Sequence, residues 1–360
     1  MESLVVSQQF WKNRTVLLTG HTGFKGGWLA LWLKQLGANV VGYALEPSAN
    51  ATFFENAQVI KAVQQNNLAD IRDMDSLSKV VQNCKPEIVI HLAAQPLVRD
   101  SYVDPLNTYS TNVMGTVNLF EAIRNVSTVK AVLNITTDKC YENKEWLWGY
   151  RENEAMGGFD PYSSSKACSE LISSAYRQSF FQQQGIALAT ARAGNVIGGG
   201  DWGTDRIVPD AMRAFIENRP LLIRNPMAIR PWQHVLEALS GYLMLCQQLI
   251  QHPDKFAEAW NFGPNEDDVQ PVSKLADIMV DSWGNKAIWV GDKGEHPHES
   301  QSLRLDCSKA KTQLKWKPVW NLERALDETV NWYKAWHNKE DMHEFTLDQI
   351  RAYHQEGQLK

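Results

Sequence analysis

The sequence contains no uninterrupted apolar run of about 18 residues, the length that a membrane-spanning helix needs. It also contains no block of lysine and arginine, and its formal net charge is −5. Both features argue against a surface that binds nucleic acid. The first 14 residues lack the basic start and the apolar core of a secretory signal. We therefore expect a cytoplasmic protein whose partners include neither a membrane nor a nucleic acid.

Cysteine is also scarce and irregularly placed. An odd number of widely separated cysteines favours free thiols in a reducing compartment over disulfides or a metal site. The five residues are Cys84, Cys140, Cys168, Cys246 and Cys307. One candidate metal cluster spans residues 295–299, where Pro297 interrupts the spacing between His296 and His298. We interpret this segment as a loop and predict no bound metal.

The first chemical signal is a glycine motif between a strand and a helix. Residues 15–19 form a short β-rich run, Gly20, Gly23 and Gly26 follow it, and residues 28–36 have helical apolar spacing. Glycines let a backbone turn tightly and approach a pyrophosphate, and a helix N-terminus presents free N–H groups to it. Strand, glycine turn and helix in this order indicate a dinucleotide site.

The next two strands carry weaker signals. An acidic residue at the end of the second strand, residues 39–44, would bind the adenosine ribose, but Glu46 comes two residues late. The choice between NAD and NADP therefore stays open at this position. Asp70 follows another extended stretch, where it either binds the adenine amino group or caps the helix that starts near Met74. His91 ends a buried strand, and we interpret it as a hydrogen-bonded structural residue rather than a catalytic base.

Two further segments bring candidate catalytic groups together. Thr137 and Asp138 follow a buried strand, residues 131–135, at the carboxyl end where ligands bind in open α/β sheets. A helix predicted over residues 162–184 places Tyr162 and Lys166 on one face, because they are four residues apart. A nearby ammonium favours the phenolate form of tyrosine, which brings the phenol within range of a general base.

These motifs occur in an order that resembles the extended short-chain dehydrogenase/reductase superfamily over nearly the whole chain. More narrowly, three runs are similar to CDP-glucose 4,6-dehydratases: residues 20–26, 137–141 and 194–202. The resemblance implies a Rossmann-type doubly wound parallel sheet with a smaller, interleaved C-terminal lobe that binds the nucleotide sugar. We place the dinucleotide-binding domain at residues 1–192 plus about 232–262, and the lobe at 193–231 plus about 263–330. Residues 331–360 are expected to form a helical tail.

The resemblance also implies NAD as the cofactor and CDP-glucose as the substrate. Asn112, a polar residue within a helix predicted over residues 105–125, is expected to orient the active-site lysine or a water. The implied cofactor-binding residues are Gly20, Thr22, Gly23, Phe24, Lys25, Gly26, Asp70, Ile71, Leu92, Ala93, Ala94, Gln95, Asn112, Tyr162 and Lys166. The implied substrate-binding residues are Asn195, Arg206, Arg230 and Trp232. Arginines suit a diphosphate because a planar guanidinium donates two parallel hydrogen bonds.

The implied reaction is an internal redox elimination that yields CDP-4-dehydro-6-deoxy-D-glucose and water. Tyr162 takes the proton of the sugar 4-hydroxyl, Thr137 hydrogen-bonds the same oxygen, and Lys166 lowers the pKa of the phenol. Asp138 matches the acid that protonates the departing 6-hydroxyl.

Two assignments are open for the residue that removes the proton from C5. Lys139 stands where dTDP-glucose and GDP-mannose dehydratases carry glutamate, so it acts either as the C5 base or as a stabiliser of the enolate. If it stabilises the enolate, another group such as Glu142 takes the C5 proton.

Two rival functions share the same motifs. A nucleotide-sugar 4-epimerase would use the tyrosine, the lysine and NAD, but it has no need of an Asp-Lys pair aimed at C5 and C6. A non-catalytic NAD-sensing protein would not need Tyr162 and Lys166. Relatives pair through helices that correspond to residues 105–125 and 162–184, so we expect a homodimer or a dimer of dimers. The product is expected to serve deoxy and dideoxy sugars of bacterial surface polysaccharide, such as lipopolysaccharide O-antigen.

Overall fold

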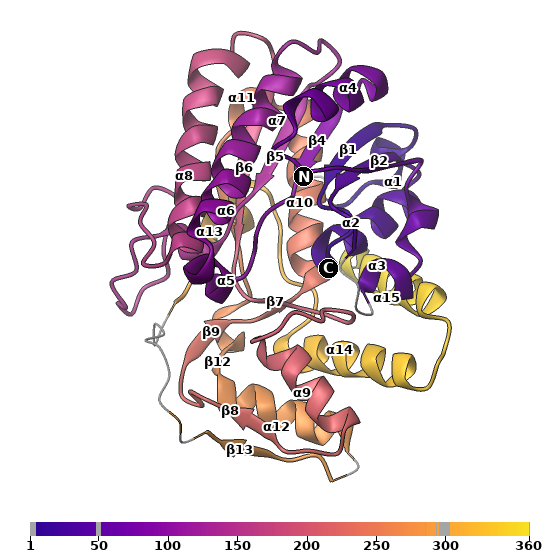
Figure 1. The fold of residues 1–360 in the computed structure, drawn as a ribbon, viewed down its shortest axis with the longest axis vertical. Helices are drawn as coiled ribbons and strands as arrows, with labels where there is room; N and C mark the ends of the chain where they lie inside the picture. Colours follow the sequence, from indigo (N-terminus) through magenta and orange to yellow (C-terminus); the bar gives the residue numbers. More distant parts are fainter. Residues whose placement is uncertain (1–4, 48–51, 285, 293, 295–302, 360) are drawn as a thin grey trace.

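The computed structural model describes residues 5–47, 52–284, 286–292, 294 and 303–359. Its centre is a sheet of seven parallel strands in the order β11-β6-β5-β4-β1-β2-β3 (Figure 1). The strands are β1 (Thr15–Thr19), β2 (Asn39–Ala44), β3 (Gln65–Leu68), β4 (Ile88–His91), β5 (Ala131–Ile135), β6 (Ala187–Ala193) and β11 (Ala259–Phe262). The predicted Rossmann-type doubly wound fold is therefore confirmed. The strand order changes direction between β1 and β4, which is where such sheets bind ligands.

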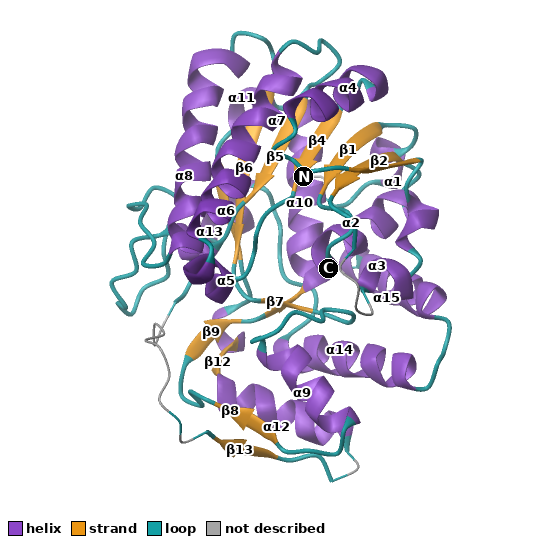
Figure 2. Cartoon of the chain, in the orientation of Figure 1, coloured by secondary structure: helices purple, strands orange, loops and turns teal. Residues whose placement is uncertain are grey.

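Helices cover both faces of this sheet (Figure 2). One face carries α2 (Phe24–Gln35) and α10 (Val235–Gln251), and the other carries α4 (Met74–Cys84), α7 (Gly115–Arg124) and α8 (Pro161–Tyr176). Because both faces are buried, the central strands are almost continuously apolar, as in Val16, Leu17 and Leu18. Among the described residues, none of the helices is long and apolar enough to cross a membrane.

The two long helices predicted beside the site are present with an irregularity each. The first runs through α6 (Pro105–Tyr109), a π-helical segment (Ser110–Met114) and α7. The second runs from α8 into another π-helical segment (Arg177–Phe181). A short helix, α5 (Val98–Val103), precedes α6. The other short elements are α1 (Gln8–Trp11), α3 (Phe53–Asn56), α11 (Pro253–Phe256), α13 (Ser308–Gln313) and the 3-10 turns Val59–Ala62, Asp138–Cys140 and Glu266–Asp268.

A smaller lobe lies beyond the carboxyl ends of the strands, in the lower half of Figure 1. It contains three two-stranded pairings and the helices α9 (Ile207–Ile216), α12 (Val272–Trp283) and α14 (Leu322–His337). The pairs are β7 (Val196–Ile197) with β10 (Gln233–His234), β9 (Ile229–Pro231) with β12 (Val269–Pro271), and β8 (Leu221–Ile223) with β13 (Trp289–Gly291). The boundary predicted at residue 331 falls inside α14, which contacts α12. The last helix, α15 (Met342–Gln358), returns to α2.

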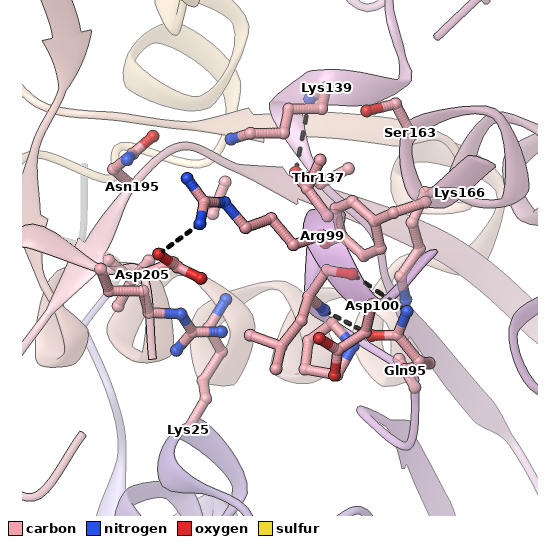
Figure 3. Close-up of a pocket in the computed structure, with 18 of the residues that line it drawn as sticks. Lys25, Gln95, Arg99, Asp100, Thr137, Lys139, Ser163, Lys166, Asn195 and Asp205 are labelled. Carbon is pink, nitrogen blue, oxygen red and sulfur yellow. Dashed lines mark hydrogen bonds and ion pairs between the residues drawn. The ribbon is translucent and has the colours of Figure 1, made fainter. Parts of the chain in front are cut away.

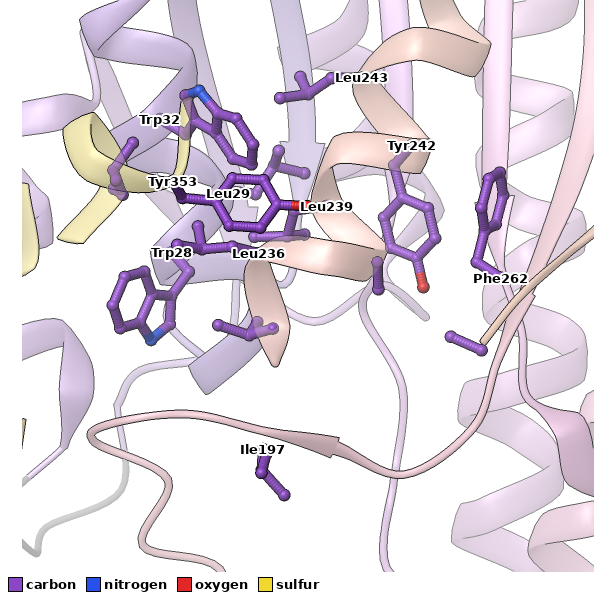
Figure 4. Close-up of a cluster of buried hydrophobic side chains, with 14 of the residues drawn as sticks. Trp28, Leu29, Trp32, Ile197, Leu236, Leu239, Tyr242, Leu243, Phe262 and Tyr353 are labelled. Carbon is purple, nitrogen blue, oxygen red and sulfur yellow. The ribbon is translucent and has the colours of Figure 1, made fainter. Parts of the chain in front are cut away.

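An aromatic layer joins α2, α10 and α15 behind the sheet (Figure 4). Trp32 of α2 meets Tyr353 of α15 edge to face, with ring centroids 5.6 Å apart. The Tyr353 hydroxyl donates a hydrogen bond of 2.6 Å to Glu237 of α10, so this buried phenol is satisfied. Because each contact crosses between different helices, the layer fixes α10 and the C-terminal helix against the glycine-bearing helix α2.

A buried ion pair ties α8 to the sheet near the site. Arg192 of β6 donates to both oxygens of Glu170 of α8, at 2.9 and 2.8 Å. Thr136 and Thr190 donate to the same carboxylate. Burial opposes the charge on Glu170, but Arg192 and the hydroxyl donors outweigh it and hold the pKa of Glu170 below its ordinary value. Arg192 also donates to the Tyr141 hydroxyl at 2.7 Å, so one network positions the segment after β5 and the helix α8.

We predict that Glu170→Gln destabilises the protein by about 3–5 kcal/mol, because the charge of Arg192 is left buried without its partner. Unfolding by urea, followed by circular dichroism, measures this difference. The difference between variant and parent should shrink as the pH falls below 4.5, because the unfolded parent then binds a proton at Glu170 that the folded parent does not, and it should be lost as the pH falls through the lowered pKa of the folded state. The double variant Glu170→Met with Arg192→Met is the control, and it should lose less stability than the single variant. A loss below about 1 kcal/mol for Glu170→Gln would contradict the assignment.

Candidate active site

A cavity of about 1360 Å³ lies between the carboxyl ends of the central strands and the smaller lobe (Figure 3). Every predicted substrate-binding residue lines it. Every predicted cofactor-binding residue also lines it, with the exception of Asn112. Of the predicted catalytic residues, Thr137, Lys139, Tyr162 and Lys166 line it, whereas Asp138 does not. The structure therefore gathers groups from distant parts of the sequence around one space.

The glycine turn after β1 forms one wall of the cavity. Gly20 has φ of 76°, a left-handed conformation that favours glycine. A Cβ added to Gly26 would lie 2.1 Å from the carbonyl oxygen of Gly20, so the turn closes only with glycine there. Gly23 is the N-cap of α2 and supplies no side-chain cap, which leaves N–H groups of the first helical turn for a ligand. This cradle fits the pyrophosphate of a dinucleotide.

Lys25, in the first turn of α2, points into the cavity from this wall. Burial lowers the pKa of Lys25 to about 8, and repulsion from Lys166 and Arg206 acts in the same direction. Attraction to Asp138 opposes the shift. Because neighbouring cations add to the effect of burial, this region would gain from an anionic ligand.

At the end of the cavity next to β3, the Asp70 carboxylate forms an ion pair with Arg72. The Arg72 guanidinium donates to both carboxylate oxygens and, together with its own backbone N–H, holds the pKa of Asp70 below its ordinary value. The alternative that Asp70 caps α4 is wrong, since Asp73 is the N-cap and accepts from the backbone N–H of Ser76. Glu46 is exposed and does not line the cavity.

His91 is a structural residue, as interpreted from the sequence. Its Nδ1 lies 2.7 Å from the hydroxyl of Thr19, and its Nε2 lies 3.3 Å from that of Thr116. Burial, with repulsion from Lys166, lowers the pKa of His91 to about 3. A neutral, buried ring with both nitrogens engaged is not placed to act as a base on a ligand.

Asn112 is held by backbone contacts rather than by the lysine. It accepts a hydrogen bond from the backbone N–H of Gln95 and donates to the Gln95 carbonyl and to the Ser165 hydroxyl. These hydrogen bonds go to Gln95 and Ser165 rather than to Lys166, and the expectation that Asn112 orients the lysine or a water stays a prediction. These three hydrogen bonds hold the segment after β4, which lines the cavity, against α8.

Tyr162 and Lys166 project from the first turns of α8 into the cavity. Asp160 caps this helix by accepting from the backbone N–H of Ser163. The Lys166 ammonium donates to the carbonyl of Ile135 at 3.0 Å, and burial lowers its pKa to about 8. Burial raises the pKa of Tyr162 to about 12, against a lowering contribution from Thr137. Desolvation thus outweighs the lowering contributions of Thr137 and Arg206, and the expected lowering by Lys166 is not among the main contributions to the pKa of Tyr162.

Asp138 is more deeply placed than the sequence suggested. Its side chain is fully buried, and its Oδ2 has no hydrogen-bond partner among the described residues. Its Oδ1 accepts from Thr137 at 3.0 Å and lies 3.4 Å from the Lys139 ammonium. Lys139 lines the cavity and Asp138 does not, and the two residues form one charged pair.

The smaller lobe contributes cations and unsatisfied polar atoms. Arg206 donates to both oxygens of Asp201, at 3.0 and 2.8 Å. Asn195 Oδ1 and Trp232 Nε1 are buried without a hydrogen-bond partner among the described residues. The sequence reasoning missed Arg99, Asp205 and Arg224, which also line the cavity. Two positions could have indicated them: Arg99 comes four residues after Gln95, the last predicted cofactor residue after β4, and Asp205 directly precedes Arg206.

The cysteine and metal predictions have different outcomes. All five cysteines are free thiols, as predicted. The segment 295–299, which the sequence offered as a candidate metal cluster, lies outside the described residues. Within the described part of the chain, no group of three or more histidine, cysteine or acidic side chains is arranged to hold a metal ion.

Comparison with known proteins places the chain in a family. The family model for GDP-mannose 4,6 dehydratase matches residues 17–329. CDP-glucose 4,6-dehydratase of Salmonella typhimurium is 53% identical over 343 residues, which cover 94% of this chain and 95% of that protein. dTDP-glucose 4,6-dehydratase of the same organism is 25% identical, covering 89% and 92% of the two chains.

Solved structures support the same fold. UDP-glucuronic acid 4-epimerase from Bacillus cereus, in complex with UDP-glucuronic acid and NAD, superposes with a TM-score of 0.77 at 24% identity, covering 89% of this chain and 99% of that one. dTDP-glucose 4,6-dehydratase from Bacillus anthracis, in complex with NAD, gives a TM-score of 0.72 at 21% identity, covering 91% and 98%. The family match, the 53% identity and the site geometry agree with the resemblance inferred from the sequence. The chain belongs to the GDP-mannose 4,6-dehydratase family of the extended short-chain dehydrogenase/reductases.

Proposed function

We propose that this protein is an NAD-dependent CDP-glucose 4,6-dehydratase, which converts CDP-D-glucose to CDP-4-dehydro-6-deoxy-D-glucose and water. One observation carries the proposal. Thr137, Tyr162 and Lys166 line the same cavity as the glycine turn, in a chain that is 53% identical to a CDP-glucose 4,6-dehydratase. The adjacent Asp138–Lys139 pair favours elimination over epimerisation, which needs no group directed at C5 and C6.

The cofactor would lie along the glycine turn and the small residues after β4. Gly20, Gly23 and Gly26 would hold its pyrophosphate, and Lys166 its nicotinamide ribose. When bound, NAD supplies the hydride acceptor for C4, and its oxidised ring adds a positive charge that favours the phenolate of Tyr162.

Each proton transfer of the reaction is assigned to a side chain at or next to the cavity. Tyr162 accepts the proton of the sugar 4-hydroxyl, and Thr137 hydrogen-bonds the same oxygen. The resulting 4-ketone acidifies the hydrogen at C5. Lys139, which faces the cavity, acts there as the base or as the cation that stabilises the enolate. Asp138, next to Lys139, would supply the proton for the departing 6-hydroxyl, and for this step its carboxyl group must first take up a proton.

The second binding region suits a nucleotide diphosphate. Arg206 and Arg230 line the lobe side of the cavity, where planar guanidinium groups can pair with phosphate oxygens. Asn195 and Trp232 each offer a buried polar atom that a ligand can satisfy.

We also propose a cytoplasmic location and a role in supplying deoxy sugars for bacterial surface polysaccharide. Five free thiols suit a reducing compartment. The proposed product is a 4-keto-6-deoxy sugar, which is an intermediate that later reductases or aminotransferases can modify at C4.

The first prediction from this proposal concerns substrate and product. Purified protein incubated with CDP-, dTDP-, UDP- and GDP-hexoses should act on CDP-glucose, giving a product lighter by one water and absorbing in strong base. Mass spectrometry identifies the product. A hexose of unchanged mass but inverted C4 would point to an epimerase, and no turnover with any nucleotide despite tight NAD binding would point to a non-catalytic protein.

The second prediction concerns the two steps of the reaction. Tyr162→Phe should lower kcat by about 10²–10⁴, because the general base for the 4-hydroxyl is lost. Lys139→Met should leave oxidation at C4 in place and slow elimination, so reduced nicotinamide accumulates on the enzyme. Rapid mixing with detection of nicotinamide absorbance separates the two steps. Near-normal dehydration by Lys139→Met would remove that residue from the mechanism.

The third prediction concerns assembly. Large apolar side chains are exposed on α5, α6 and α8, including Val103 at 86%, Leu106 at 83% and Leu171 at 60%. We propose that these helices form a homodimer interface, since such a cluster costs free energy in water. Leu106→Glu with Leu171→Glu should give a monomer in analytical ultracentrifugation. Ile288→Glu, an exposed apolar residue of the lobe, is the control and should leave the parent's mass unchanged. A parent protein that sediments as a monomer would refute the interface.

A further inference from the structure

An ion pair spans the cavity between the two parts of the molecule. Arg99 belongs to α5, beside the large sheet, and Asp205 belongs to the lobe segment just before α9. Arg99 Nη1 lies 2.9 Å from Asp205 Oδ1, and both residues line the cavity. Figure 3 shows the Arg99 side chain extended through the cavity toward the carboxylate. The contact therefore connects the two sides of the cavity in which the ligands are proposed to bind.

The same carboxylate organises the lobe side of the cavity. Arg224, which follows β8, reaches Asp205 Oδ1 at 3.4 Å. Arg206, the residue after Asp205, forms an ion pair with Asp201 at 2.8 Å. Asp205 has φ of 59°, which is uncommon for a residue other than glycine, so its contacts hold the backbone in a disfavoured conformation. The segment 201–206 is thus fixed by ion pairs on both sides of the arginine proposed to hold the substrate diphosphate.

We propose that Arg99 and Asp205 form a latch across the cavity that retains the nucleotide sugar during turnover. They would act as positioning residues, and this inference rests on the proposed dehydratase function. The latch joins the part of the molecule that holds the cofactor to the part that holds the substrate, so its closure keeps the two ligands in one enclosure.

The proposed reaction gives retention a clear purpose. After the first step the hydride is on the cofactor, and the sugar carries a ketone. The sugar must then lose water and take the hydride back at C6. An intermediate that leaves early would strand the enzyme with a reduced cofactor and no acceptor. A closing contact that lasts through these steps and then opens would prevent this loss.

The strength of the pair suits a contact that must open in every cycle. The side chains of Arg99 and Asp205 are 48% and 41% exposed, so water and salt screen their attraction. Asp210, an acid within electrostatic reach of Arg99, is already paired with Arg213. Asp205 is consequently the acid that is placed to hold Arg99 across the cavity.

The test measures release of CDP from NAD-loaded enzyme by stopped-flow displacement. Arg99→Gln and Asp205→Asn should each speed release by about two- to fivefold, the range expected for one exposed ion pair. The double variant should release CDP no faster than either single variant, because both remove the same contact. Raising the salt concentration should speed release from the parent and have little effect on the variants. Arg219→Gln breaks an equally exposed pair with Glu217 away from the cavity, and it should release CDP like the parent.

A second readout follows turnover of CDP-glucose. Both latch variants should accumulate enzyme-bound reduced nicotinamide and release some 4-keto sugar before the hydride returns, whereas Arg219→Gln should not. Unchanged CDP release in both variants would overturn the proposal. So would slower release from Asp205→Asn alone, because Asp205 would then be a competitor for an arginine that binds the substrate directly. If the parent binds CDP but does not dehydrate CDP-glucose, the proposed function fails while the release measurements still decide the latch.

Discussion

The buried pair of Glu170 and Arg192 is the interaction on which the site depends most. It joins α8, which carries Tyr162 and Lys166, to β6, which lies between β5 and the edge strand β11. The same carboxylate accepts from Thr136, the residue before Thr137. A charge pair of this kind is stabilising only when its remaining hydrogen-bonding positions are filled. Here the two threonine hydroxyls fill positions on Glu170, and the Tyr141 hydroxyl and the Glu152 carbonyl fill positions on Arg192.

A second constraint is the concentration of positive charge around the cavity. Lys139, Lys166 and Arg206 all lie within electrostatic reach of Lys25. Burial already penalises the ammonium groups of Lys25 and Lys166, and the pKa of each falls to about 8. Two ligands that each carry a diphosphate would relieve this repulsion. The cavity is therefore better matched to a dinucleotide and a nucleotide sugar together than to a neutral sugar.

Local patterns were sufficient to predict most of the fold. The strands at residues 39–44 and 131–135 match β2 and β5, because short apolar runs between turn residues have few alternatives in an α/β protein. Family spacing also located the glycine turn and the tyrosine-lysine pair. The capping role of Asp73, three residues from Asp70, was missed because either aspartate could cap a helix that starts near Met74. Asn112 was placed correctly on its helix, but its partners lie on other elements.

The sequence alone determined the family, the parallel sheet and the residue types available for catalysis, since these depend on periodicity and on motifs within single segments. Only the tertiary structure decided that Asp138 is buried and paired with Lys139, that burial dominates the pKa of Tyr162, and that Arg99 meets Asp205 across the cavity. These properties arise from contacts between segments distant in the chain. Desolvation and pairing depend on the surrounding atoms in space, and spacing along one segment does not specify them.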